Sequence, residues 1–142
     1  MRYEFASPQW LAALHGIIVE RADREAEVKP QLSMSICEVF TDAPARLAGP
    51  ERRIVWSCVV QGGEIDFRLA ERDDVRMKVV VPYDKVLALG RYDTRGDPAR
   101  AAELAAIAAA LRASGDMQTI GPHHPEPQAI SSVHDAIARL TE

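Results

Sequence analysis

Two stretches of the sequence, residues 63–69 and 73–81, alternate between apolar and polar residues. In the first, Ile65, Phe67 and Leu69 alternate with three charged residues. In the second, valines and Met77 fill the apolar positions, with mostly charged residues between them. A period of two is typical of a strand with one buried and one solvated face. The alternation therefore predicts a sheet whose apolar face is covered by another layer.

A third stretch, residues 53–61, comes directly before these two. Its residues on one side are Ile54, Trp56, Cys58 and Val60. Residues 61–64 read Gln-Gly-Gly-Glu, which is a hairpin signal, and residues 70–74 form a polar turn. The sequence thus predicts three antiparallel strands in a row over residues 53–81.

Helices are predicted on both sides of this unit. Ser7 can cap the first amides of a helix, and Pro8 loses no hydrogen bond at its first position. Asp97 and Pro98 repeat this pair before an alanine-rich helix that ends at Gly115. Pro30 is expected to end the first helix. The remaining elements are a strand at 32–40, a mobile loop at 41–51, a short helix from Pro82 that ends at Gly90, a strand at 116–120, and a helix with Ile130, Val133, Ile137 and Leu140 on one face.

Composition limits the possible partners. The chain has 142 residues, of which 47% are hydrophobic, and a net charge of −4. We expect a single α+β domain over residues 1–142, and the acidic balance argues against nucleic acid or an anionic membrane as the main partner. The sequence shows no signal peptide and no run long enough for stable membrane insertion, which predicts a cytoplasmic protein. Cys37 and Cys58 lie in apolar runs, so we expect buried free thiols.

Histidines suggest a metal site only weakly. His123 and His124, with Glu126 nearby and His134 further along, could hold a metal ion. Adjacent residues of an extended segment point in opposite directions, however, and no recognised zinc spacing is present. His15 could be a general base, but it lies among apolar residues and is expected at the edge of the core. The residues predict no metal and no cofactor.

No catalytic set is predicted either. Asp73 and Asp74 resemble a carboxylate pair for acid–base chemistry, but aspartates are common in turns, and turn chemistry is the expected role. Several large apolar side chains could instead line a pocket for an adaptable apolar guest. They are Trp10, Trp56, Phe67, Met77, Leu104, Leu111 and Met117.

Residues 74–90 (DVRMKVVVPYDKVLALG) and 115–121 (GDMQTIG) are a strand followed by a short helix and a strand bounded by glycines. Together with the opening FASPQWL at 5–11, they resemble the sterol carrier protein type 2 domain family. The resemblance implies a mixed, mainly antiparallel five-stranded sheet with helices on one face. It also implies an apolar tunnel between the two layers.

That family resemblance implies a non-catalytic protein that binds or carries a fatty-acyl or sterol-like lipid. By position, the first helix, the inward side of the strands and the helix at 98–113 would line the tunnel. The expected ligand-binding residues are Trp10, Leu14, Ile18, Trp56, Phe67, Met77, Leu104, Ile107, Leu111 and Met117. Arg91, Arg95 or His15 could hold a polar head group. The alanine-rich helix and the loop at 41–51 are longer than the family pattern and could fill the tunnel.

Two other functions remain open at the level of sequence. One is a small enzyme of a cone-shaped α+β fold, similar to nuclear transport factor 2, that uses His15 with Asp66 or Asp73. A helix that closes the chain disfavours this fold. The other is an interaction module with a closed interior, which would form a homodimer. A filled or open space between the sheet and its helices distinguishes these hypotheses from lipid carriage.

Overall fold

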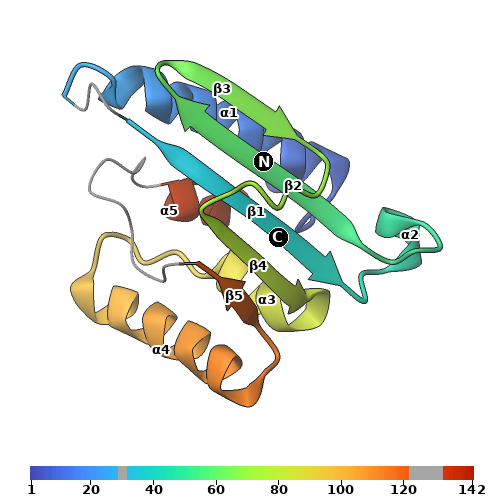
Figure 1. Cartoon of the computed structure of the whole chain (residues 1–142). Coiled ribbons are helices and arrows are strands. Elements are labelled where there is room, and N and C mark those ends of the chain that lie inside the picture. The colour runs from blue at the N-terminus through green and yellow to red at the C-terminus, as the bar shows by residue number, and fades with distance from the viewer. Residues whose placement is uncertain (29–31, 122–132) are drawn as a thin grey trace.

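The sheet has five strands in the order β3-β2-β1-β4-β5 (Figure 1). The computed structural model describes residues 1–28, 32–121 and 133–142. The central strand β1 pairs in parallel with β4, and the other three pairings are antiparallel. The strands are β1 (Met34–Thr41), β2 (Ile54–Gln61), β3 (Glu64–Arg68), β4 (Met77–Pro82) and β5 (Gln118–Ile120). The predicted α+β fold with a mixed, mainly antiparallel five-stranded sheet is confirmed.

The prediction of three consecutive antiparallel strands is only half right. β2 and β3 form the expected hairpin, and Gly62 and Gly63 have the positive φ angles, 59° and 83°, that a tight hairpin turn requires. β4, however, begins only at Met77 and pairs with β1 and β5 rather than with β3. Alternation defines which face of a strand is apolar, but it does not define the partner strand. The resulting chain path is a crossover over residues 69–76.

This crossover runs over the face of the sheet opposite the helices (Figure 1). Beneath it, Cys37 and Ser57 are fully buried, and Ser57 Oγ donates a hydrogen bond to the Ala70 carbonyl oxygen at 2.9 Å. Arg72 pairs with Asp66 at 3.1 Å and with Asp74 at 2.9 Å. Lys78 pairs in the same way with Glu71 and Asp73. This ion-paired layer covers one face of the sheet with polar side chains.

Both cysteines are buried free thiols, as predicted. Cys58 lies on the helical face, beside Trp56 and Val60, whereas Cys37 lies under the crossover. Burial raises the pKa of Cys58 to about 11 and also raises the pKa of Cys37. Neither thiol is a reactive group at neutral pH.

The first helix forms as predicted at its start. α1 (Pro8–Glu25) begins after Ser7, whose Oγ accepts a hydrogen bond from the Trp10 amide at 3.2 Å. Trp10 Nε1 donates to Thr141 Oγ1 at 2.9 Å, and the Tyr3 amide donates to the Leu140 carbonyl oxygen at 2.6 Å. These contacts tie α1 and the residues before it to the C-terminal segment. α1 ends at Glu25, and the proposed stop at Pro30 lies outside the described residues.

The other helices agree with the sequence in position and differ in detail. The loop predicted at 41–51 contains a single helical turn, α2 (Ala45–Ala48). α3 (Tyr83–Arg91) runs through Gly90 rather than ending there. A Cβ at Gly90 would lie 2.5 Å from the Phe5 ring, so this glycine allows a close approach of Phe5 instead of ending the helix. The remaining helices are α4 (Pro98–Ser114) and α5 (Val133–Arg139). Leu140, predicted on the last helix, follows its end, and Ile130 lies outside the described residues.

α1, α3 and α5 cover one face of the sheet, and α4 lies near its β5 edge (Figure 1). The apolar core lies between these layers and includes Phe5, Trp10, Ile18, Phe40 and Trp56. Among the described residues, no helix combines the length and the apolar composition needed to span a membrane.

Candidate ligand-binding site

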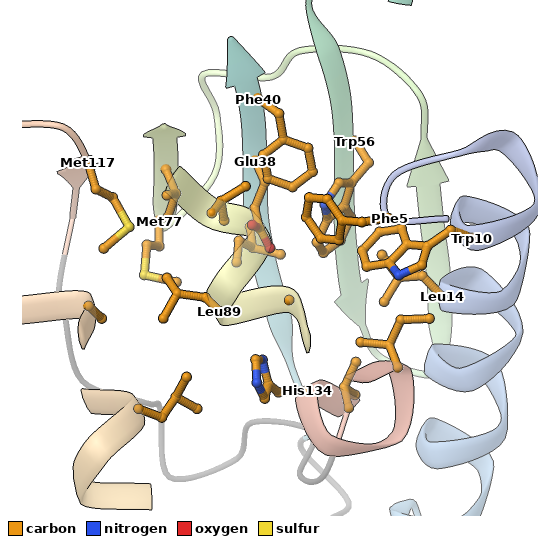
Figure 2. Close-up of a pocket in the computed structure, with 18 of the residues that line it drawn as sticks. Phe5, Trp10, Leu14, Glu38, Phe40, Trp56, Met77, Leu89, Met117 and His134 are labelled. Atoms are coloured by element: carbon orange, nitrogen blue, oxygen red, sulfur yellow. The ribbon is translucent and has the colours of Figure 1, made fainter. Parts of the chain in front are cut away.

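A pocket of about 370 Å³ lies between the helical face of the sheet and the helices that cover it (Figure 2). Its floor comes from the three strands β2, β1 and β4, and its walls from α1, α3, α4 and α5. Most of the lining is apolar. The size and character of this space are those of a site for a small apolar ligand.

The register of the sheet explains which strand residues reach the floor. Ile36, Glu38 and Phe40 alternate on the inward side of β1. Glu38 lies directly opposite Trp56 on β2 and Val79 on β4. Side chains at paired positions of neighbouring strands point to the same face. These residues therefore line one continuous surface at the centre of the sheet.

Aromatic rings close the pocket on the α1 side. The Phe5 ring packs edge-on against Trp10, with the ring centroids 4.8 Å apart, and against Phe40 at 5.2 Å. Gly90 of α3 leaves the space that the Phe5 ring occupies. This wall is built from buried, tightly packed side chains, which favours a preformed rather than an induced pocket.

The α4 side is different. No residue of α4 is buried, and only its Leu104, Ala108 and Arg112 line the pocket. Alanine side chains are too short to reach the floor of the sheet from the axis of the helix. The alanine-rich composition that could have filled the interior therefore leaves it open.

Two exposed residues of the lining mark the mouth of the pocket, Arg112 on α4 and His134 on α5. Arg112 Nε donates to Thr119 Oγ1 at 3.4 Å. His134 Nε2 donates to the Tyr92 carbonyl oxygen at 2.8 Å. Both side chains are thus oriented by protein contacts at the edge of an apolar space.

Glu38 is the polar residue of the floor, and its carboxyl group points into the pocket (Figure 2). Within the described residues it makes no hydrogen bond and no ion pair. Burial among apolar side chains raises its pKa to about 7. Trp56 Nε1, on the paired strand, is buried and also has no hydrogen-bond partner among the described residues. Glu38 is not among the predicted site residues, although it shares the inward side of its strand with Ile36 and Phe40.

The structure brings together six of the ten residues predicted for a ligand site. These six are Trp10, Leu14, Trp56, Met77, Leu104 and Met117. The other four lie elsewhere: Ile18 is part of the fully buried core, Ile107 and Leu111 lie on α4 outside the pocket lining, and Phe67 stacks on Trp56 with ring centroids 5.8 Å apart.

The residues considered for a polar head group do not line the pocket. Arg91 Nε donates to the Glu142 carbonyl oxygen at 2.5 Å, and Arg95 is exposed. His15 is exposed on α1 and stacks on Phe67, with ring centroids 4.4 Å apart. Arg112 and His134 occupy the position at the mouth that these three residues were considered for.

The acid–base pair of the enzyme hypothesis is not assembled. Phe67 faces His15 on the helical side, so its neighbour Asp66 points to the opposite face, where it pairs with Arg72. Asp73 pairs with Lys78 on that same face. Within the described ranges, no group of three His, Cys, Asp or Glu side chains could hold a metal ion. His123, His124 and Glu126 lie outside the described residues.

No family model matches the chain, and no curated protein matches it. One of the solved structures that it resembles covers most of the chain. It is titled "UbiJ-SCP2 Ubiquinone synthesis protein", with a TM-score of 0.44 and 15% sequence identity over 94% of this chain and 93% of that chain. Membership of this chain in the sterol carrier protein type 2 domain family stays a prediction.

Proposed function

We propose that this protein binds an apolar small molecule in the pocket between the sheet and its helices. One observation carries the proposal: a preformed space of about 370 Å³ with an apolar lining and a polar mouth. A group of the size of water takes up about 30 Å³ in the liquid, so the pocket has room for about a dozen such groups. This is the size of a medium-length acyl chain or of a compact ring system.

The expected affinity follows from the apolar surface that the ligand loses to the pocket. Each buried methylene contributes about 0.8 kcal/mol, so ten contribute about 8 kcal/mol before the costs of association. A dissociation constant of about 1 μM corresponds to about 8 kcal/mol, and we therefore expect micromolar or weaker binding. The packed aromatic wall reduces the cost of ordering the site on binding.

The polar groups of the lining favour binding over catalysis. Glu38 has no neighbouring base or nucleophile in the lining, and His134 is engaged with a backbone carbonyl at the mouth. Glu38 is thus the one titratable group at the floor among the described lining residues, and no second side chain of the lining is placed to relay its proton. We therefore interpret the pocket as a carrier site. The homodimer stays a prediction, which sedimentation at several protein concentrations would test.

A pocket-filling substitution tests the proposal with a matched control. Ala108→Phe places a ring in the pocket from α4, whereas Ala109→Phe places the same ring on the exposed side of the same helix. Calorimetric titration with undecanoate should give at least tenfold weaker binding for Ala108→Phe and unchanged binding for Ala109→Phe. Absence of binding to the unmodified protein, or equal binding by both variants, would refute the proposal.

A further inference from the structure

The floor of this apolar pocket contains one carboxyl group, which is costly to bury without a hydrogen-bond partner. Glu38 projects from the central strand, and its carboxyl group points into the pocket (Figure 2). A leucine or a methionine at this position would match the surrounding side chains and carry no cost of desolvation. An unpaired polar group in such a place is expensive unless a hydrogen bond compensates it.

Among the residues that the structure describes, none in the lining is paired with Glu38. The other titratable or charged residues of the pocket lining are Arg112 from α4 and His134 from α5, both exposed at the mouth. Arg112 contacts Thr119, and His134 contacts the Tyr92 carbonyl. The lining residues from α1, α3, β2 and β4 carry no ionisable side chain.

Trp56 is a second polar side chain in the floor that lacks a hydrogen-bond partner among the described residues. Its side chain is only 4% exposed, and its Nε1–H, which can only donate, has no acceptor among the described residues. Trp56 and Glu38 are directly paired across β2 and β1. Two polar groups without partners therefore lie next to each other in an otherwise apolar floor.

We propose that Glu38 forms a hydrogen bond with an uncharged oxygen, a hydroxyl or a carbonyl, at the buried end of the ligand. This inference rests on the proposed function and specifies the chemistry of the ligand. The ligand would be an apolar molecule with a neutral oxygen on the end that reaches the sheet. Its other end would lie at the mouth, near Arg112 and His134.

A hydroxyl group suits this floor in either protonation state of Glu38. It can donate to the carboxylate, and it can accept from the protonated acid. A carbonyl oxygen suits only the protonated acid. A ligand carboxylate at the buried end is disfavoured by the charged form of Glu38, because two carboxylates in an apolar pocket repel each other. The site thus selects against a fatty-acid anion inserted head first.

The test uses two ligands of equal size, undecanoate and its analogue in which a hydroxyl replaces the terminal methyl group. Their common carboxylate stays at the mouth, so the two ligands differ only at the buried end. Calorimetry on the full chain gives the ratio of the two dissociation constants. We expect the unmodified protein to bind the hydroxyl analogue at least as tightly as undecanoate, although an apolar floor would strongly prefer the methyl group.

Two variants then isolate Glu38. Glu38→Met keeps the length of the side chain and removes the hydrogen bond, so it should shift the ratio about tenfold or more toward undecanoate. Glu38→Gln keeps hydrogen bonding without charge and should preserve the preference of the unmodified protein. Circular dichroism and thermal melting establish that each variant is folded before its ratio is compared.

A pH series adds a readout that does not depend on the Glu38→Met variant. Glu38 titrates with a pKa of about 7, so titrations at about pH 6 and about pH 8.5 sample its neutral and charged forms. Undecanoate should bind more weakly at the higher pH, since its methyl group would cover a charged carboxylate, and the hydroxyl analogue should change less. In Glu38→Gln the ratio should be the same at both pH values.

The outcomes separate this inference from the proposed function. If neither ligand binds the unmodified protein, the carrier site itself is wrong. If both bind but the ratio of their dissociation constants is the same, within about twofold, in the unmodified protein and in Glu38→Met, the pocket binds apolar chains without help from Glu38. That result would overturn the inference and leave the pocket as a carrier site. A ratio that shifts toward undecanoate in Glu38→Met and stays unchanged in Glu38→Gln supports the inference.

Discussion

The two long helices α1 and α4 begin in the same way and pack very differently. Each has a polar cap followed by proline, Ser7-Pro8 for α1 and Asp97-Pro98 for α4, and each cap accepts a backbone hydrogen bond. α1 has 18 residues and buries the side chains of Trp10, Leu11, Leu14, Ile18, Ala22 and Glu25, whereas α4 has 17 residues and buries none. The difference lies in side-chain size, since α4 is mostly alanine.

This contrast explains why the pocket lies where it does. A helix packs against a sheet through the side chains that fill the space between their axes. α1 provides large side chains that meet the sheet and the Phe5 ring, so its side of the interior is full. α4 provides Leu104 and Ala108, which leave the space between them and the floor open. The same local signals thus produce one structural helix and one helix that borders a site.

Replacing one isoleucine in each helix should give the largest difference in stability between α1 and α4. Ile18→Ala on α1 removes a fully buried side chain and should lower the free energy of unfolding by about 2–5 kcal/mol. Ile107→Ala on α4 removes a partly exposed one and should cost less than about 1 kcal/mol. Urea denaturation measures both. Equal losses would show that α4 is packed as firmly as α1.

The pH dependence of stability in Glu38→Gln tests whether the carboxyl group of Glu38 is buried beside the space that α4 leaves open. The pKa of Glu38 rises from 4.5 to about 7 on folding, so between these values the folded chain binds more protons than the unfolded chain. Stability contributed by this group therefore falls as pH rises from 4.5 to 7, and the loss is complete above 7. At about 1.36 kcal/mol for each pKa unit, Glu38→Gln should gain at most about 3 kcal/mol above pH 7.

Denaturation of both proteins at about pH 4 and about pH 8 measures this difference, because these values bracket the pKa of Glu38 in the unfolded and folded chain. The stability of the variant relative to the unmodified protein should be higher at the upper pH. If the difference between the two proteins does not change with pH, the carboxyl group is not buried in an apolar pocket.

Glycine substitutions in α3 and α1 should give smaller effects on stability, of opposite sign. Gly90→Ala on α3 introduces a Cβ 2.5 Å from the buried Phe5 ring and should destabilise the protein by about 1–3 kcal/mol. Gly16→Ala on α1 meets no atom within 4 Å and should stabilise it by about 0.5–1 kcal/mol. Thermal melting compares them. A stabilising Gly90→Ala would mean that the Phe5 ring can move aside without cost.

Local signals in the sequence predicted much of the fold. The Gly62-Gly63 turn, the caps of α1 and α4 and the inward side of β2 depend on neighbouring residues, and all are confirmed. The partner of β4 was wrong because strand pairing is set by contacts between distant residues. Its alternation fits equally well beside β3 or beside β1.

The pocket was predicted only in part, because its shape also depends on contacts between distant residues. Six of the ten residues predicted for a ligand site lie in the pocket lining, but sequence does not show where packing leaves a gap. Phe67 is half-buried and stacks on Trp56 outside the pocket, whereas Met77 is equally half-buried and lines it. Glu38 was missed because a single charged residue in an apolar strand resembles an imperfection of the pattern.

Binding of a series of fatty acids of increasing chain length tests the open space beneath α4 most directly. Each added methylene should tighten binding about fourfold, as expected for burial worth about 0.8 kcal/mol. The gain should stop once the chain fills the pocket, at about a dozen heavy atoms for a volume of about 370 Å³. An affinity that does not depend on chain length would show that α4 and the sheet enclose no usable space.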